Sequence, residues 1–85
     1  MPDDTEREAV KEAWGRAATY FRKATTIVTT NASYWLGLGQ SSYYLEDYDT
    51  AERAFRRALQ YDPNNKDART GLETIEKVKS RKRLQ

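Results

Sequence analysis

Apolar residues recur at steps of three and four along much of this 85-residue chain, and that spacing constrains its fold more than any other feature. Side chains three and four positions apart share one face of an α-helix, whereas a half-buried strand needs alternation at every second residue. The longest such stripe contains Val10, Trp14, Ala17, Phe21, Ala24 and Val28. It predicts one long helix over residues 4–28, continuous through Gly15 because the stripe keeps its phase there.

The two ends of this helix also have sequence signals. Thr5 and Glu8 have the spacing of a capping box, in which each side chain accepts a hydrogen bond from the other residue's backbone N–H. Threonines and Asn31 near the far end favour termination, because their side chains compete for backbone hydrogen bonds. We therefore expect the helix to begin near Asp4 and to be followed by a turn.

Two shorter helices are predicted next. Asn31 is suited to cap a segment over residues 32–45, and Asp49, answered by Glu52, is suited to cap another over residues 50–61. The apolar side of the later segment is wide enough to contact two neighbours. We expect that helix to be sandwiched.

Pro63, within a run of turn-forming residues, ends the third helix. The segment 66–79 then has an apolar side and a charged side, which is typical of a helix that caps an array. Residues 80–85 form a basic tail. The prediction is a single all-α domain over residues 1–85, an antiparallel array of about four helices.

Residues 32–65 closely resemble the tetratricopeptide repeat, a 34-residue unit with the pattern W-x2-L-G-x2-Y, then A-x3-F, then P. The matching residues are Trp35, Leu38, Gly39, Ala51, Phe55 and Pro63. Ser42 replaces the tyrosine of the pattern, with Tyr43 and Tyr44 beside it. Glu46 stands where the family usually has glycine in the turn between helices. Because a non-glycine residue in a left-handed conformation costs about 1 kcal/mol, we expect this turn to be less tight than usual.

A shift of 34 residues aligns Ala17, Phe21 and Ala24 with Ala51, Phe55 and Ala58. The first long helix therefore resembles the second helix of a preceding repeat, and the last segment resembles the first helix of a following one. One full repeat is flanked by two partial ones. Because such arrays usually need about three units, we expect a fragment of, or a design based on, a longer array, or completion of the core by self-association.

The resemblance implies a protein or peptide partner on the inner face formed by the first helix of each repeat. By helical phase this face contains Ser33, Leu36, Gly37, Gln40, Tyr43, Tyr44, Asp67, Thr70, Thr74 and Lys77. The partner-binding candidates among them are Leu36, Gln40, Tyr43, Tyr44, Thr70, Thr74 and Lys77. Tyrosine suits an interface because it offers a large, stiff surface with a polar tip. The alternative is that Tyr43 and Tyr44 pack against the first helix or the cap.

Some members of the family bind the terminal carboxylate of a heat-shock chaperone with basic and asparagine side chains. The matching positions here hold Leu36, Gly37, Gln40, Asp67 and Gly71, so this clamp is absent. The string from Tyr34 to Gly39 is also similar to the central repeat of bacterial secretion chaperones, which cradle an extended peptide.

Catalysis and metal binding are not expected. The chain has no cysteine and no histidine, so it lacks the thiolate nucleophile, the usual general base and the commonest metal ligands. The basic residues Lys77, Lys79, Arg81, Lys82 and Arg83 suit a solvated helix end better than a nucleic-acid or membrane site, because no aromatic residue is interleaved. We expect no enzyme, cofactor or metal.

No apolar run approaches membrane-spanning length, and the first residues are acidic where a signal peptide would be basic. The net charge is +2. A soluble, cytoplasmic protein-interaction module is the predicted function. A structural or self-associating, dimerising module is the alternative.

Overall fold

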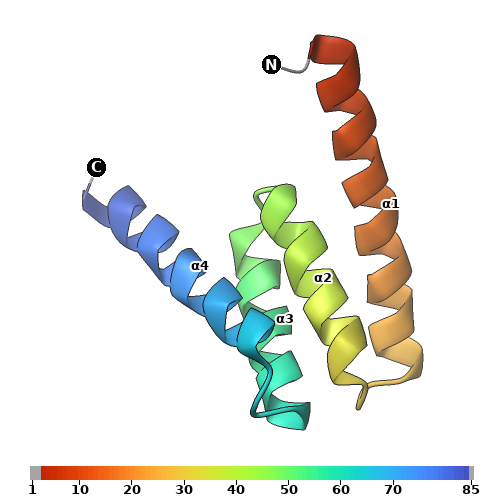
Figure 1. The fold of residues 1–85 in the computed structure, drawn as a ribbon, viewed down its shortest axis with the longest axis vertical. Helices are drawn as coiled ribbons and strands as arrows, with labels where there is room; N and C mark the ends of the chain where they lie inside the picture. The colour runs from red at the N-terminus through yellow and green to blue at the C-terminus, as the bar shows by residue number, and fades with distance from the viewer. Residues whose placement is uncertain (1–2, 85) are drawn as a thin grey trace.

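The computed structural model describes residues 3–84, and every regular element within them is a helix. The helices are α1 (Asp4–Ile27), α2 (Ala32–Tyr44), α3 (Tyr48–Tyr61) and α4 (Lys66–Leu84). They lie side by side in sequence order, each antiparallel to the one before (Figure 1). This confirms the predicted all-α array, and α1 runs through Gly15 without a break.

The helices differ in how many neighbours they have. α2 packs against α1, α3 and α4, and α3 packs against α2 and α4. Among the described helices, α1 packs against α2 alone, and its N-terminal half extends beyond the end of α2 (Figure 1). One flank of α1 is therefore not covered by another helix of the described chain.

The start of α1 differs from the prediction. Asp3 is the N-cap, in an extended conformation, and its carboxylate accepts a hydrogen bond from the Glu6 N–H at 2.8 Å. Thr5 lies inside the first turn, so the predicted capping box is wrong; an aspartate two residues earlier takes the same role. At the start of α2 the predicted cap is confirmed, because the Asn31 side chain accepts from the Tyr34 N–H at 3.2 Å.

The same correction applies to α3. Its N-cap is Asp47, which accepts from the Thr50 N–H at 3.3 Å, so the helix begins two residues before the predicted start. The predicted cap Asp49 lies in the first turn. Glu46, in the turn before α3, has a φ of 63°, so the left-handed backbone of this turn is kept without a glycine.

Three helices end at other residues than predicted, two of them by one residue and the third by five. α1 ends at Ile27 and α2 at Tyr44, each one residue early. α4 continues to Leu84 rather than 79, so the predicted basic tail is helical over most of its length. Two contacts with α3 explain the extension: Lys79 pairs with Asp49 at 2.7 Å, and the Lys82 ammonium lies 4.9 Å from the Tyr48 ring centre. Residues 1–2 and 85 lie outside the described part.

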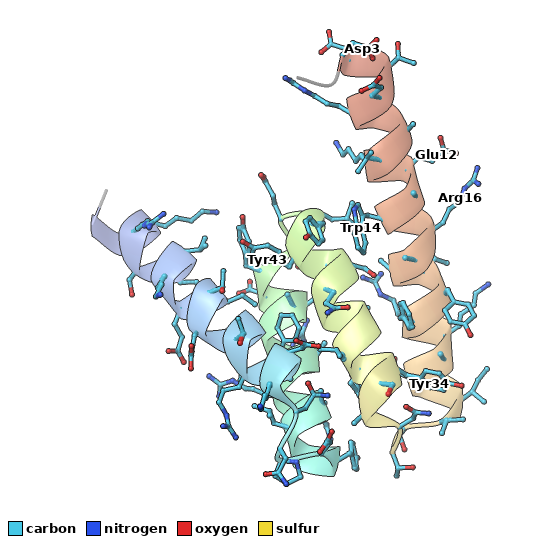
Figure 2. The ribbon with its side chains drawn as sticks, in the orientation of Figure 1. Asp3, Glu12, Trp14, Arg16, Tyr34 and Tyr43 are labelled. Atoms are coloured by element: carbon cyan, nitrogen blue, oxygen red, sulfur yellow. The ribbon has the colours of Figure 1, made fainter. Side chains whose placement is uncertain are left out.

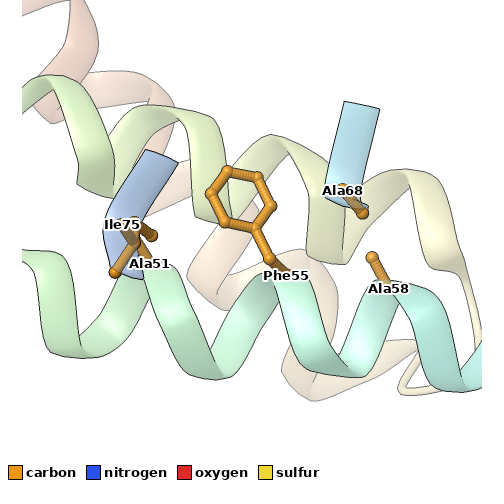
Figure 3. Packing of buried hydrophobic residues seen from close by; sticks show 5 residues of the cluster. All are labelled: Ala51, Phe55, Ala58, Ala68 and Ile75. Carbon is orange, nitrogen blue, oxygen red and sulfur yellow. The ribbon is translucent and has the colours of Figure 1, made fainter. Parts of the chain in front are cut away.

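The core is built around Phe55 on α3. A Cβ atom added to Gly39 on α2 or to Gly71 on α4 would lie 2.6 Å from the Phe55 ring, so both backbones approach the ring closely. Around it are buried small and branched side chains on α3 and α4 (Figure 3): Ala51, Ala58, Ala68 and Ile75. The glycines therefore allow one aromatic ring to fill the space between three helices.

The same contact recurs one repeat earlier. Gly37 on α2 is buried against the ring of Phe21 on α1, as Gly71 is against Phe55, and both residues of the pair are shifted by 34 positions. The sequence alignment of α1 with α3 thus corresponds to equivalent packing in space.

Candidate functional site

A groove of about 400 Å³ lies where α2 faces α4. Its walls also include residues of α1 and α3, and the lining residues are Trp14, Gln40, Tyr43, Tyr44, Phe55, Asp67, Thr70, Gly71 and Thr74. α2 and α4 diverge toward one end of the array (Figure 1), and the groove lies between them.

The structure brings five of the seven candidate binding residues to this groove: Gln40, Tyr43, Tyr44, Thr70 and Thr74. Leu36 is half-buried and packs against the core around Phe55. Lys77 is exposed further along α4, beside Glu73 and Glu76. Leu36 and Lys77 are therefore outside the groove lining.

Two other residues of the expected inner face can also be placed. Gly37 is not on that face, because its backbone is buried against Phe21 of α1. Asp67 does line the groove, and it is the one charged residue among the nine lining residues. Gln40 thus lines the groove, whereas Gly37 faces α1.

An aromatic row forms one end of the groove. Tyr44 stacks on Trp14 of α1, with ring centres 4.4 Å apart and planes 17° from parallel. Tyr43 meets Tyr44 edge-on at 5.7 Å and Tyr48 of α3 at 5.8 Å. Figure 2 shows Trp14 reaching from α1 toward the end of α2 where Tyr43 lies. The two tyrosines pack against neighbours, as the alternative interpretation expected, yet Tyr44 remains 60% exposed.

Polar groups line the other end. The Thr74 hydroxyl donates to the Thr70 carbonyl at 2.9 Å, which leaves its oxygen able to accept another hydrogen bond. Gln40 is exposed on the facing helix and offers both an amide donor and an amide acceptor. A partner in the groove could thus form hydrogen bonds with both walls.

The contribution of α1 to the groove lining was not predicted from the sequence. A second hollow of about 450 Å³ adjoins the groove across the Trp14–Tyr44 stack, lined by Arg7, Val10, Lys11, Trp14, Tyr44, Leu45 and Glu46. Trp14 was assigned to helix packing alone. Its alignment with Tyr48 under the 34-residue shift was the signal that it stands near the end of α2.

The ion pairs between α3 and α4 lie away from the groove. Lys79 donates a hydrogen bond to Asp49 and also lies 3.5 Å from Glu52, which ties α4 to α3. The hydrogen bond from Lys79 lowers the pKa of Asp49, and the same bond raises the pKa of Lys79. Loss of hydration raises the pKa of the Tyr48 phenol, and the nearby Glu46 carboxylate adds to this. These groups stabilise the α3–α4 contact.

Within residues 3–84 no three metal-ligating side chains cluster together. In the same part of the chain no helix has the length and apolar character to span a bilayer.

Comparison with known proteins explains this arrangement. Residues 32–65, which comprise α2, α3 and the turn after it, match the family model described as Tetratricopeptide repeat. Residues 32–65 are a tetratricopeptide repeat. The contact of Gly39 with Phe55 lies within this repeat, and those of Gly37 with Phe21 and of Gly71 with Phe55 join it to α1 and α4. Tetratricopeptide repeats generally mediate contacts between proteins.

One curated relative is similar over a longer stretch. The chain is 36% identical over 58 residues, 68% of its length, to the general transcriptional corepressor trfA of Dictyostelium discoideum. The matched stretch is 4% of that relative's length. The chain thus spans a small part of the relative's length.

Proposed function

We propose that this chain is a non-catalytic protein-interaction module that binds a peptide segment in the groove between α2 and α4. The observation that carries the proposal is the groove's lining: Tyr43 and Tyr44 at one end, Gln40 facing Thr70 and Thr74 at the other, and a single charge, Asp67. Aromatic rings and neutral hydrogen-bonding groups are the surface that peptide backbones and apolar side chains bind. The partner is a protein of the cell interior.

The lining also restricts the kind of peptide. A terminal carboxylate would find no basic side chain among the nine lining residues, and Asp67 would repel it. We therefore propose an internal segment with an apolar or aromatic side chain against Tyr43 and Tyr44. Leu36 and Lys77 lie outside the lining, and Lys77 would contact only a segment that continues along α4.

The test uses a displayed random-peptide library selected on the immobilised chain, followed by fluorescence anisotropy with a selected peptide. We expect micromolar binding that falls about tenfold, equivalent to about 1.4 kcal/mol, in Tyr44→Ala and in Gln40→Ala. Both side chains are exposed, so the fold should be retained. Gln60→Ala is the matched control for Gln40→Ala, because Gln60 is also exposed but lies on α3 outside the groove lining. Binding that survives both groove variants would refute the proposal.

A further inference from the structure

α1 carries a second apolar stripe, on a flank that no described helix covers. Its members, separated by alternating steps of three and four, are Val10, Ala13, Ala17, Tyr20, Ala24 and Ile27. We call this the outer stripe. Val10, Tyr20 and Ile27 are 56%, 60% and 80% exposed, whereas the side toward α2 contains the buried Ala18 and Thr25. A seven-residue apolar period in an exposed helix is the pattern that packs against another helix.

The equivalent positions on α3 are covered by a second neighbouring helix, which the outer stripe of α1 lacks among the described helices. Ala51, Ala54 and Ala58, which align with Ala17, Tyr20 and Ala24 of the outer stripe, are at most 1% exposed because α2 and α4 enclose α3. On α1 the two alanines are half-buried and Tyr20 is exposed. A helix in the place that α2 occupies beside α3 would cover the outer stripe.

Head-to-tail stacking of copies cannot supply that helix, because α4 presents the wrong surface. Trp35 and Gly39 are two of the α2 residues that pack toward the core at α3. The residues 34 positions later on α4 are Arg69 and Glu73, both charged and exposed. Placing them against the outer stripe would bury charges on an apolar face, which is costly. Among the described helices, α4 is therefore charged at these two positions, whereas the flank of α1 is apolar and uncovered.

The outer stripe of a second copy is a suitable surface. Three of its six members are alanines, which let two helix backbones approach closely, and Val10, Tyr20 and Ile27 supply the larger side chains. The charges of α1 fix the direction of pairing. Residues 4–15 hold four acids and two bases, and residues 16–27 hold three bases and no acid. An antiparallel pair places each acidic half beside a basic half, whereas a parallel pair places like halves together.

We infer that the outer stripe is a dimer interface, at which α1 pairs antiparallel with α1 of a second copy of this chain. The contact is isologous, so it closes at two copies and leaves both peptide grooves on other faces of the molecule. It is a different surface from the proposed groove, and each can be tested without the other.

The first experiment measures mass by multi-angle light scattering as a function of concentration. We expect twice the 9.9 kDa of one chain at high concentration. Tyr20→Glu with Ile27→Glu should restore the mass of a single chain, because it introduces like charges on an exposed apolar face. The matched control is Thr19→Glu with Thr26→Glu, which adds the same charges at the same spacing on exposed positions off the stripe and should leave the dimer intact. A strictly monomeric chain, or equal dissociation in both double variants, would overturn the inference.

The second experiment tests direction without disturbing the stripe. The chain has no cysteine, so Thr5→Cys or Thr19→Cys gives a single site for a nitroxide label. At 1.5 Å of rise per residue, an antiparallel pair centred near the middle of α1 separates the two Thr5 labels by about 30–40 Å. The Thr19 labels should be much closer. Equal distances at the two sites would mean a parallel pair and would overturn the proposed geometry.

Discussion

α1 and α3 are the same structural position one repeat apart, and they differ in their number of neighbours. Phe55 on α3 is 3% exposed between α2 and α4, while its equivalent Phe21 on α1 is half-buried against α2. Ala54 is 1% exposed and its equivalent Tyr20 is 60% exposed. The comparison shows that one sequence pattern produces a core or a surface according to how many helices surround it. Differences in mutational cost between the two helices should measure this directly.

The largest difference is expected for the two phenylalanines. Phe55→Ala should cost about 3–5 kcal/mol, because it leaves a cavity between three helices. The stability of a domain this small is about 4–12 kcal/mol, so the variant should lose a large fraction of it. Phe21→Ala should cost about half as much, since one side of its ring is already uncovered. Urea unfolding followed by circular dichroism, at a concentration where the chain is monomeric, checks both values. Equal costs would show that α1 is packed as fully as α3.

Substituting the glycines in contact with these rings should also cost more stability beside Phe55 than beside Phe21, but by a smaller amount. In Gly71→Ala the new Cβ meets the Phe55 ring, which cannot retreat because Gly39 contacts its other side, so we expect a loss of about 1–3 kcal/mol. In Gly37→Ala the Phe21 ring can rotate toward the uncovered flank. The gain of about 1 kcal/mol in helix propensity should then offset much of the strain.

Gly15→Ala is the control for that propensity gain, because an added Cβ at Gly15 has nothing within 4 Å. We expect it to raise the urea midpoint. The gain measured for Gly15→Ala is subtracted from the effects of the other two glycine variants. If Gly37→Ala is then as destabilising as Gly71→Ala, the flank of α1 is more rigid than its exposure indicates.

The helices and the repeat register could be predicted from the sequence because they depend on periodicity, which is local and repeated. The cap of α2 was predicted, but those of α1 and α3 could not be, since Asp3 and Asp47 lie close to other capping side chains and only the backbone shows which one is used. The groove residues from α2 were predicted by helical phase. Trp14 was missed because its contact with Tyr44 joins residues 30 positions apart on different helices.

Two adjacent serines show a further limit. Ser41 and Ser42 are both buried, but the Ser41 hydroxyl donates to the Gly37 carbonyl at 2.7 Å, while the Ser42 hydroxyl has no partner among the described residues. Ser42 occupies the place of the tyrosine in the repeat pattern. Nothing in the sequence distinguishes a satisfied hydroxyl from an unsatisfied one, because that depends on side-chain rotation within the packed helices.

The smallest expected effect is electrostatic, and it again differs between α3 and α1. Asp49 and Glu52 on α3 pair with Lys79 on α4, whereas the positions 34 residues earlier hold Gly15, Ala18 and Leu45. The pKa of Asp49 is lowered in the folded chain, so its contribution is present above about pH 4 and lost as the pH falls below that value. The pKa of Lys79 is raised, so its contribution is lost only as the pH rises above about 10.5.

Asp49→Asn should therefore lower Tm slightly at pH 7 and low salt, and the difference from the unmodified chain should vanish near pH 2 and in about 1 M salt, where exposed charges are screened. Glu12→Gln is the control, because Glu12 pairs with Arg16 within α1 and joins no second helix. Scanning calorimetry at several pH values measures both. A larger decrease in Tm for Glu12→Gln than for Asp49→Asn would mean that the ion pair between α3 and α4 does not stabilise the contact of α3 with α4. The difference in stability between α1 and α3 would then come from apolar packing alone.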